Sequence, residues 1–263
     1  MEYVLSLSYG KDSLACLGAI EQLGWPLDRI VHAEVWATDT IPADLPPMVE
    51  FKAKADEIIY RRWGIRVEHF RADVSYQDVF YRPRLSTRRK DLPVQPIYGF
   101  PILKGAWCNS HLKMAPIKKA KPNGGVSYVG IAADEPERIA RQACKPDTKM
   151  PLVEAGWTEA MCREWCERND LLSPIYTTAT RGGCWFCHNQ GVQQLRQLRR
   201  DYPELWQLML KWDADSPVTF KPDGHTVHDF DERFRLEDEL LIDPTKTFRW
   251  EMLTSDLQYR MDI

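Results

Sequence analysis

The sequence has no apolar run that approaches the about 18 residues needed to cross a bilayer. Residues 1–8 carry no basic flank and no small-residue cleavage site, so they do not resemble a secretory signal. Internal repeats and low-complexity segments are missing as well. We therefore expect a cytoplasmic protein that has no membrane partner.

Cysteine is sparse, with 7 among 263 residues, and none follows Cys187. An odd number of cysteines without an export signal disfavours a disulfide framework and favours metal binding or redox chemistry. The hydrophobic share of 44% and the charged share of 28% are close to globular averages, which excludes a disordered, collagen-like or fibrous chain.

The net charge of −3 conceals a strong local imbalance. Residues 81–121 hold 10 lysines and arginines and 1 acid, whereas residues 201–263 hold 7 basic and 15 acidic residues. A basic middle part in an acidic chain predicts an anionic ligand that is bound locally. The basic segment 82–121, with Tyr81, Tyr98 and Trp107 available for base stacking, predicts contact with a nucleotide or a nucleic acid. A solvated loop is the alternative.

Apolar spacing predicts strands that alternate with helices. The expected strands are residues 3–8, 30–37, 67–70 and 127–131, and the expected helices are residues 12–23, 45–63, 107–120, 159–168 and 193–212. This alternation is typical of an α/β fold, a parallel twisted sheet with helices on both faces. We expect an α/β domain over residues 1–176, followed by a cysteine turn and a helical C-terminal region over residues 177–263.

The sharpest motif lies directly after the first expected strand and opens the first expected helix: Ser8-Tyr9-Gly10-Lys11-Asp12-Ser13. Such a turn aims backbone amides and the positive end of the helix dipole at one point, which favours an anion. Gly10 allows close approach, Ser8 and Ser13 add hydroxyl donors, and Lys11 adds a positive charge. Asp12 either caps the helix or holds Mg²⁺ beside phosphates. The alternative is a tight turn capped by Asp12; the spacing of a Walker loop is missing.

This hexapeptide resembles the PP-loop of the ATP-pyrophosphatase, or adenine-nucleotide alpha-hydrolase, superfamily, and is closest to its phosphoadenosine-phosphosulfate reductase branch. Further motifs of that branch follow in the same order. They are Asp39-Thr40; Trp107-Cys108 with Leu112-Lys113 and Pro116; residues 130–135 (GIAADE) with Arg138; and Pro151-Leu152, Gly156-Trp157-Thr158 and residues 172–176 (LSPIY). The resemblance covers about residues 3–190.

The resemblance implies a sheet that binds ATP or an adenylyl nucleotide with Mg²⁺, and cleavage of ATP between its α and β phosphates. It implies catalytic roles for Lys11, Asp12 and Arg138. It implies that the nucleotide is bound by a larger set: Ser8, Tyr9, Gly10, Lys11, Asp12, Ser13, Asp39, Thr40, Gly130 and Asp134. Ala132 departs from the family pattern, which often has arginine there, and Arg141 is the candidate to supply the missing anion contact.

Cys184 and Cys187 form a C-x-x-C pair in a glycine-rich turn, a spacing that suits one metal centre or a redox dithiol. With Cys108 upstream, the pattern resembles adenylyl-sulfate reductases that carry a [4Fe–4S] cluster, except that Asn109 replaces a second adjacent cysteine. The resemblance implies three ligands, Cys108, Cys184 and Cys187, and an open iron that takes His188, His111 or sulfide. Zinc with His188 as the fourth ligand, and a metal-free site, are the alternatives.

Three functions follow. The first is adenylation of a substrate for iron–sulfur-assisted sulfur transfer, which needs a sulfur donor. The second is reduction of adenylyl sulfate or phosphoadenylyl sulfate to sulfite with a thioredoxin-like reductant, but the C-terminal cysteine of such reductases has no counterpart here. The third is a non-catalytic nucleotide-binding subunit, with a structural metal, in a nucleic-acid-modification complex. The acceptor, the donor and the oligomeric state, including a homo-oligomer, stay open.

Plainer expectations apply to other residues. Cys162 and Cys166 have i, i+4 spacing on an expected helix and should pack in the core. His225 and His228 follow no fixed spacing of metal ligands, so we expect them in a hydrogen-bonded loop. A second metal site and a proton-transfer group are the alternatives. Residues 233–239, rich in both charges, predict a solvated helix face.

Overall fold

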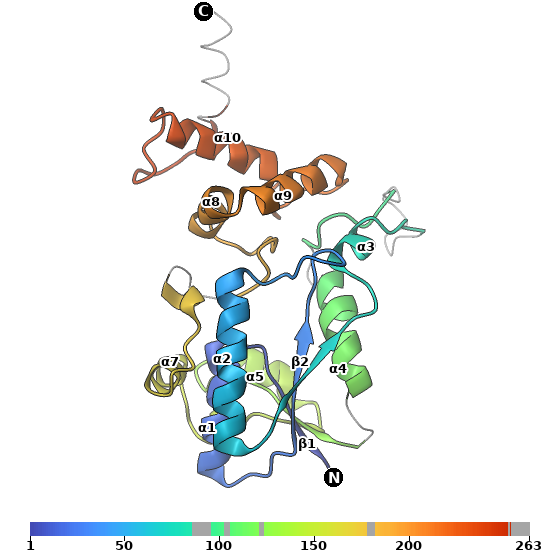
Figure 1. Cartoon of the computed structure of the whole chain (residues 1–263), viewed down its shortest axis with the longest axis vertical. Coiled ribbons are helices and arrows are strands. Elements are labelled where there is room, and N and C mark those ends of the chain that lie inside the picture. The colour runs from blue at the N-terminus through green and yellow to red at the C-terminus, as the bar shows by residue number, and fades with distance from the viewer. Residues whose placement is uncertain (86–95, 103–105, 121–123, 178–181, 252, 254–263) are drawn as a thin grey trace, which may run out of the picture. The chain divides into compact units, whose positions relative to one another are not determined.

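A computed structural model describes residues 1–85, 96–102, 106–120, 124–177, 182–251 and 253 (Figure 1). The chain divides into two compact units. The first unit comprises Met1–Val79 and Gly105–Trp185, and the second comprises Phe80–Lys104 and Phe186–Ile263. Within the described residues, no helix is both long enough and apolar enough to span a membrane.

The first unit is built on a sheet of 5 strands, all of them parallel, in the order β3-β2-β1-β4-β5. The strands are β1 (Tyr3–Ser6), β2 (Arg29–Glu34), β3 (Val67–Arg71), β4 (Val126–Tyr128) and β5 (Thr148–Lys149). The predicted parallel α/β fold is therefore confirmed. The strands β1, β2 and β4 end earlier than their apolar runs, because the chain beyond each strand leaves the sheet to form the loops of its carboxyl edge.

Helices cover both faces of this sheet. Figure 1 shows α1 (Lys11–Leu23) and α2 (Pro46–Trp63) on one side of the strands and α4 (Ala115–Ala120) on the other. Right-handed crossovers explain this placement, because the chain moves outward from β1 through β2 to β3 and then returns past β1 to β4. The other elements of this part of the chain are α3 (Tyr76–Phe80), η1 (Asn109–Met114), α5 (Pro136–Ala143), α6 (Pro151–Glu154), α7 (Glu159–Arg168) and η2 (Pro174–Thr177).

The core of the first unit includes the interface between α1 and α7. Cys16 on α1 and Cys162 and Cys166 on α7 are fully buried there, in one cluster with Leu14 and Leu17. Burial raises the pKa of all three thiols, to about 12 for Cys162 and Cys166. The predicted core role of Cys162 and Cys166 is confirmed, and these thiols pack as small apolar groups.

The order of the strands reverses at β1. The chain adds β2 and then β3 on one side of β1 and afterwards adds β4 and β5 on the other side. In a parallel α/β sheet, the loops that leave the carboxyl ends of the strands at such a reversal diverge and leave a crevice for a ligand. The loop over residues 7–10, after β1, and the segment over residues 129–135, after β4, both start at this edge.

The second unit contains helices α8 (Val192–Asp201), α9 (Pro203–Asp215) and α10 (Val227–Asp238). The prediction of one helix over residues 193–212 is wrong, since α8 and α9 are separated at Tyr202. Tyr202 has φ −137° and ψ 64°, and Pro203 is the first residue of α9. Proline disfavours helical backbone in the residue before it. Pro203 was therefore the signal in the sequence that predicts this break.

The prediction that the charged residues of segment 233–239 form a solvated face is wrong for Arg233 and Glu237. Arg233 and Glu237 are buried on α10, at 9% and 7% exposure. Arg233 Nε lies 2.9 Å from Glu237 Oε1, and Arg196 of α8 donates to both oxygens of the same carboxylate. Two guanidinium groups therefore hold the pKa of Glu237 below its ordinary value, although burial alone would raise it.

Candidate nucleotide-binding site

The motif over residues 8–13 forms a closed turn between β1 and α1. The backbone N–H of Ser8 donates to Ser13 Oγ over 3.1 Å, and the Ser8 hydroxyl donates to the same oxygen over 3.0 Å. The Ser13 hydroxyl in turn donates to the carbonyl of Gly10 over 2.9 Å. These bonds link the two ends of the motif, and the first turn of α1 begins at the carboxyl edge of the sheet.

The residue of this turn that adopts an unusual backbone conformation is Tyr9 and not Gly10. Gly10 is the N-cap residue of α1, in extended conformation at φ −77° and ψ 155°, which any residue can adopt. The residue in left-handed conformation is Tyr9, at φ 57°. No side chain caps the helix, so the alternative of a turn capped by Asp12 is wrong. Of the first-turn amides, that of Lys11 donates to the hydroxyl of Tyr176 and not to a capping residue.

The glycine that permits close approach is Gly130, directly beyond β4. A Cβ atom on Gly130 would lie 2.8 Å from the backbone nitrogen of Ser13 and 2.9 Å from the carbonyl carbon of Asp12. The absence of a side chain at Gly130 thus lets the segment after β4 lie against the first turn of α1.

Gly130→Ala should weaken both the fold and the loop. The atoms that a Cβ would meet are backbone atoms of α1, so the first turn must shift, and we expect a loss of about 1–3 kcal/mol in the free energy of unfolding. Chemical denaturation measures this loss. Gly182→Ala is the control, because a Cβ on Gly182 would meet no heavy atom of the described residues within 4 Å. Equal stability of the two variants would contradict the close packing of Gly130 on α1.

Lys11 is held by carboxylates at the mouth of the turn. Its ammonium lies 2.7 Å from Asp12 Oδ1 and 3.5 Å from Glu159 Oε2, and its side chain is 11% exposed. Burial alone would lower the pKa of Lys11, but the pairing with Asp12 and Glu159 outweighs burial and raises it. Lys11 is therefore an ammonium at neutral pH. Its backbone N–H donates to the hydroxyl of Tyr176, on η2, over 3.1 Å.

Three carboxylates from different elements meet beside Lys11. Asp12, Glu135 and Glu159 each offer a carboxylate oxygen, and these oxygens lie within 4.8 Å of one another. In the described part of the chain this is the one group of at least three metal-ligating side chains that meets this distance. Glu135 also accepts the backbone N–H of Ala132 over 3.1 Å and pairs with Arg138. Carboxylate oxygens are the ligands that Mg²⁺ prefers, so this donor set fits that ion.

The other residues expected to contact the nucleotide follow the strands β2 and β4 and differ in exposure and in hydrogen-bond partners. Arg138 is on α5, 46% exposed in its side chain. Asp134 accepts the backbone N–H of Glu159 over 3.0 Å, so its carboxylate also holds the start of α7. Asp39 and Thr40 are exposed in the loop after β2, where the Asp39 carboxylate lies 3.8 Å from the guanidinium of Arg71.

Tyr9 is the expected contact whose side chain points elsewhere. Its ring is fully buried in the core cluster. Its hydroxyl donates to Asp56 of α2, away from the first turn of α1. A nucleotide at this loop would therefore meet the backbone of Tyr9 and not its ring.

The predicted metal ligands are partly buried thiols without disulfides. Cys108 is the N-cap residue of η1, a π-helical turn within the predicted helix over residues 107–120, and such turns are frequent at functional sites. Cys184 precedes Trp185, whose backbone N–H donates to Ala43 over 3.0 Å and whose indole N–H donates to Pro42 over 2.9 Å. These bonds tie Cys184 to the loop after β2. Among the described residues, Cys108, Cys184 and Cys187 belong to no group of metal-ligating side chains, and the shared metal centre stays a prediction.

In the second unit, the turn around Cys187 is held by a lysine. The Lys221 ammonium donates to the carbonyls of His188 and Gln190 over 2.6 Å each. Burial lowers the pKa of Lys221, and Cys187 and Asp223 act against this shift. The Asn189 amide also donates to Cys187 Sγ over 3.8 Å. These contacts hold the turn in which Cys187 stands.

The two histidines of the C-terminal region have structural partners. His225 stacks on Trp250 with ring centroids 3.7 Å apart. His228 lies in the first turn of α10, and its Nδ1 is 2.5 Å from Asp213 Oδ2. Among the described residues they join no group of metal-ligating side chains. The expected loop ends at Thr226, the N-cap residue of α10, so the loop prediction is wrong for His228.

The basic segment is only partly described. Arg88, Arg89, Lys90, Lys104 and Lys121 lie outside the described residues. Arg84 lies over the ring of Tyr98 at 5.8 Å, and Lys119 pairs with Asp73 over 2.6 Å. Contact of this segment with a nucleic acid stays a prediction.

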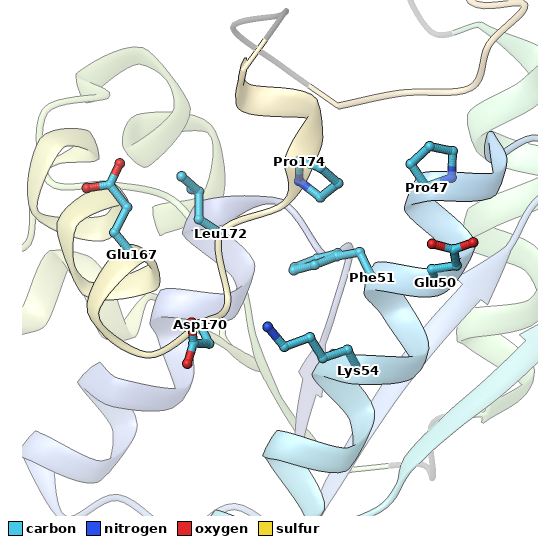
Figure 2. Close-up of a pocket in the computed structure, with 8 residues that line it drawn as sticks. All are labelled: Pro47, Glu50, Phe51, Lys54, Glu167, Asp170, Leu172 and Pro174. Atoms are coloured by element: carbon cyan, nitrogen blue, oxygen red, sulfur yellow. The ribbon is translucent and has the colours of Figure 1, made fainter.

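A separate groove of about 570 Å³ lies between α2 and the segment after α7 (Figure 2). Apolar side chains share its lining with carboxylates and one ammonium: Pro47, Glu50, Phe51, Lys54, Glu167, Asp170, Leu172 and Pro174. Because the carboxylates outnumber the ammonium and no residue of the loop takes part, the groove does not suit a triphosphate.

The fold defines a parallel α/β protein in which a hydrogen-bonded turn over residues 8–13 follows the first strand. Comparison of the sequence with models of protein families gave no match, and a search of curated proteins gave none either.

Sequence reasoning missed several residues that the structure brings to the loop. Glu135 and Glu159 join Asp12, and Tyr176 bonds to the amide of Lys11. Glu135 and Tyr176 stand within the recognised motifs, and Glu159 directly follows one, so their positions were visible but their partners were not. Asp56 and His69, which hold Tyr9, belong to none of the motifs and carried no sequence signal.

Proposed function

We propose that this protein is a PP-loop enzyme of the phosphoadenosine-phosphosulfate reductase type, which adenylates a substrate with ATP for iron–sulfur-assisted sulfur transfer. The observation that carries the proposal is the turn over residues 8–13 at the reversal of strand order, with the Lys11 ammonium at its mouth. The order of the sequence motifs supports the choice of the nucleotide. The three thiols of Cys108, Cys184 and Cys187 support the choice of iron–sulfur-assisted sulfur transfer as the step that follows adenylation.

In the adenylation step, a substrate oxygen attacks the α-phosphorus of ATP, and the bond to the oxygen that bridges the α and β phosphates breaks. Pyrophosphate leaves with the bonding electron pair, so negative charge grows on it. Lys11 and the first-turn amides of α1 would stabilise this charge, because fixed donors need no reorganisation during the reaction. Arg138 would add a second cation near the phosphates.

Two bound groups complete the proposal. Mg²⁺, held by Asp12 with Glu135 and Glu159, would neutralise phosphate charge and orient the triphosphate. A cluster held by Cys108, Cys184 and Cys187 would supply the sulfur that replaces AMP on the substrate. Lys221 would support that centre by fixing the carbonyls on either side of Asn189. The chain itself contributes the thiolates and their orientation.

The direct test is release of pyrophosphate from ATP by the full chain purified without oxygen. We expect release that depends on Mg²⁺ and on an acceptor, with nucleic acids and free nucleosides as the probes. Transfer of labelled AMP to the acceptor should accompany it. Absence of release with every probe would contradict the proposed enzyme, and sulfite formed from adenylyl sulfate with thioredoxin would favour the reductase instead.

A further inference from the structure

A buried polar network lies behind the phosphate-type loop and is not used by the proposed chemistry. Its centre is Tyr9, which has no exposed surface and adopts φ 57°. Non-glycine residues adopt this left-handed conformation infrequently, and they keep it where the surrounding structure holds them. The question is therefore what holds Tyr9.

Two side chains from different elements hold the Tyr9 hydroxyl. It donates to the carboxylate of Asp56, on α2, and lies 3.3 Å from Nε2 of His69, on β3. His69 Nε2 is also 2.8 Å from the second oxygen of Asp56, and His69 Nδ1 is 2.9 Å from Glu34 Oε1. Each nitrogen of His69 thus faces a carboxylate, and both contacts are hydrogen bonds only when the imidazole carries both protons.

A second arm of the network reaches the residue that precedes the loop. His32 Nδ1 is 2.8 Å from the carbonyl of Leu7, and its Nε2 is 2.9 Å from the ammonium of Lys52. Lys52 also pairs with Asp44 over 2.5 Å. Burial, and then the charge of Lys52, lower the pKa of His32 to about 3, so this ring is neutral, donates to Leu7 and accepts from Lys52.

The two arms meet at Tyr9. The His32 ring meets the ring of Tyr9 edge-on, with centroids 4.8 Å apart, and the Lys52 ammonium lies 5.2 Å from the centroid of the same ring. The network thus fixes Leu7 through its carbonyl and Tyr9 through both its ring and its hydroxyl. These residues stand on either side of Ser8, at the entrance to the turn.

We propose that Tyr9 is a positioning residue, which the Asp56–His69 pair clamps so that the amides of residues 10–13 keep the geometry that binds the nucleotide phosphates. This inference rests on the proposed nucleotide binding. It goes beyond that proposal because it assigns part of the affinity for the nucleotide to Tyr9, Asp56 and His69, whose side chains do not touch the nucleotide. Release of the Tyr9 hydroxyl would leave the left-handed turn with fewer restraints, and a looser turn binds anions less well because it must be ordered on binding.

The clamp depends on pH through His69. The hydrogen bond to Asp56 raises the pKa of His69, burial lowers it, and the charges of Asp56 and Glu34 raise it further, so that the net shift is upward. The charged and titratable groups around this ring are Glu34 and His32 on β2, Asp56 and Lys52 on α2, and Tyr9 on the loop. With a raised pKa in the folded state, the clamp is complete below the ordinary pKa of histidine and is lost as the pH rises through the raised one.

The test compares Tyr9→Phe with Tyr60→Phe in the full chain, by titration with Mg·ATP. Tyr60 is an exposed tyrosine of α2, so its variant controls for the loss of a hydroxyl. We expect Tyr9→Phe to weaken ATP affinity about tenfold, the effect of one lost hydrogen bond, and Tyr60→Phe to leave it unchanged. A merely structural role would lower the melting temperature of Tyr9→Phe without changing the affinity at temperatures well below melting.

A second variant keeps the inference testable if Tyr9→Phe does not fold. ATP affinity of the wild type should fall as the pH rises through the raised pKa of His69, relative to an ATP-binding reference protein measured in the same buffers. His69→Gln should lose this pH dependence. If the wild type binds no ATP, the proposed function fails. If it binds ATP while His69→Gln keeps the full pH dependence, or Tyr9→Phe binds as tightly as the wild type, the clamp is overturned.

Discussion

Lys11→Ala is expected to lower pyrophosphate release by a factor of at least about 10²–10³, because it removes the cation that we propose stabilises the leaving pyrophosphate. The fold should persist. The lost ion pair with Asp12 is partly exposed, so we expect a change of only about 1 kcal/mol in the free energy of unfolding. Single-turnover kinetics with labelled ATP measure the first effect, and denaturation followed by circular dichroism measures the second.

The control for this variant is Lys54→Ala. Lys54 is an exposed lysine of α2 and lines the separate groove, so its loss removes one positive charge without touching the loop. We expect its rate to equal that of the wild type. Full activity of Lys11→Ala, or an equal loss in both variants, would mean that the loop over residues 8–13 is not the phosphate site.

Cys184→Ser should abolish the proposed metal centre. In protein purified without oxygen we expect a brown colour, with absorption near about 400 nm from iron–sulfur charge transfer, and the variant should lose both the colour and the bound iron and sulfide. Thiolate is a far better ligand than a serine hydroxyl for soft metal centres, so one substitution suffices. Absorption spectra and elemental analysis for iron, sulfide and zinc measure the effect.

Cys144→Ser is the matched control for the metal prediction. Cys144 is an exposed cysteine that follows α5 and belongs to none of the predicted ligands. Its variant should keep the colour and the metal content of the wild type. A colourless wild type with one zinc per chain would overturn the iron assignment, and loss of metal in Cys144→Ser would overturn the ligand set.

The two largest effects concern residues whose chemistry is legible in the sequence. Lys11 is the charged member of a six-residue motif, and Cys184 is half of a C-x-x-C pair. In the six-residue motif and in the C-x-x-C pair, a short stretch of chain determines which side chains stand next to each other. The effects predicted for Gly130 and Tyr9 are smaller, and they depend on atoms that only the folded chain brings close to them.

The sequence by itself determined the local elements and the class of fold. The helix α7 has the predicted limits, residues 159 and 168, because Thr158 caps it by accepting the amide of Met161 and the apolar spacing continues to its end. Alternation of strands with helices was enough to predict a parallel sheet, since parallel strands need long crossovers. Even the missed break before Pro203 was encoded locally.

Only the tertiary structure decided which distant side chains meet. Asp56 and His69 reach Tyr9 across 47 and 60 residues of chain, and Glu135 and Glu159 reach Asp12 from elements that follow β4. Arg233 and Glu237 are buried on α10, where Glu237 is the shared partner of Arg233 and of Arg196 from α8. Hydrophobic periodicity specifies which face of an element is buried, but polar partners across elements depend on the order of strands and the packing of helices, which periodicity does not encode.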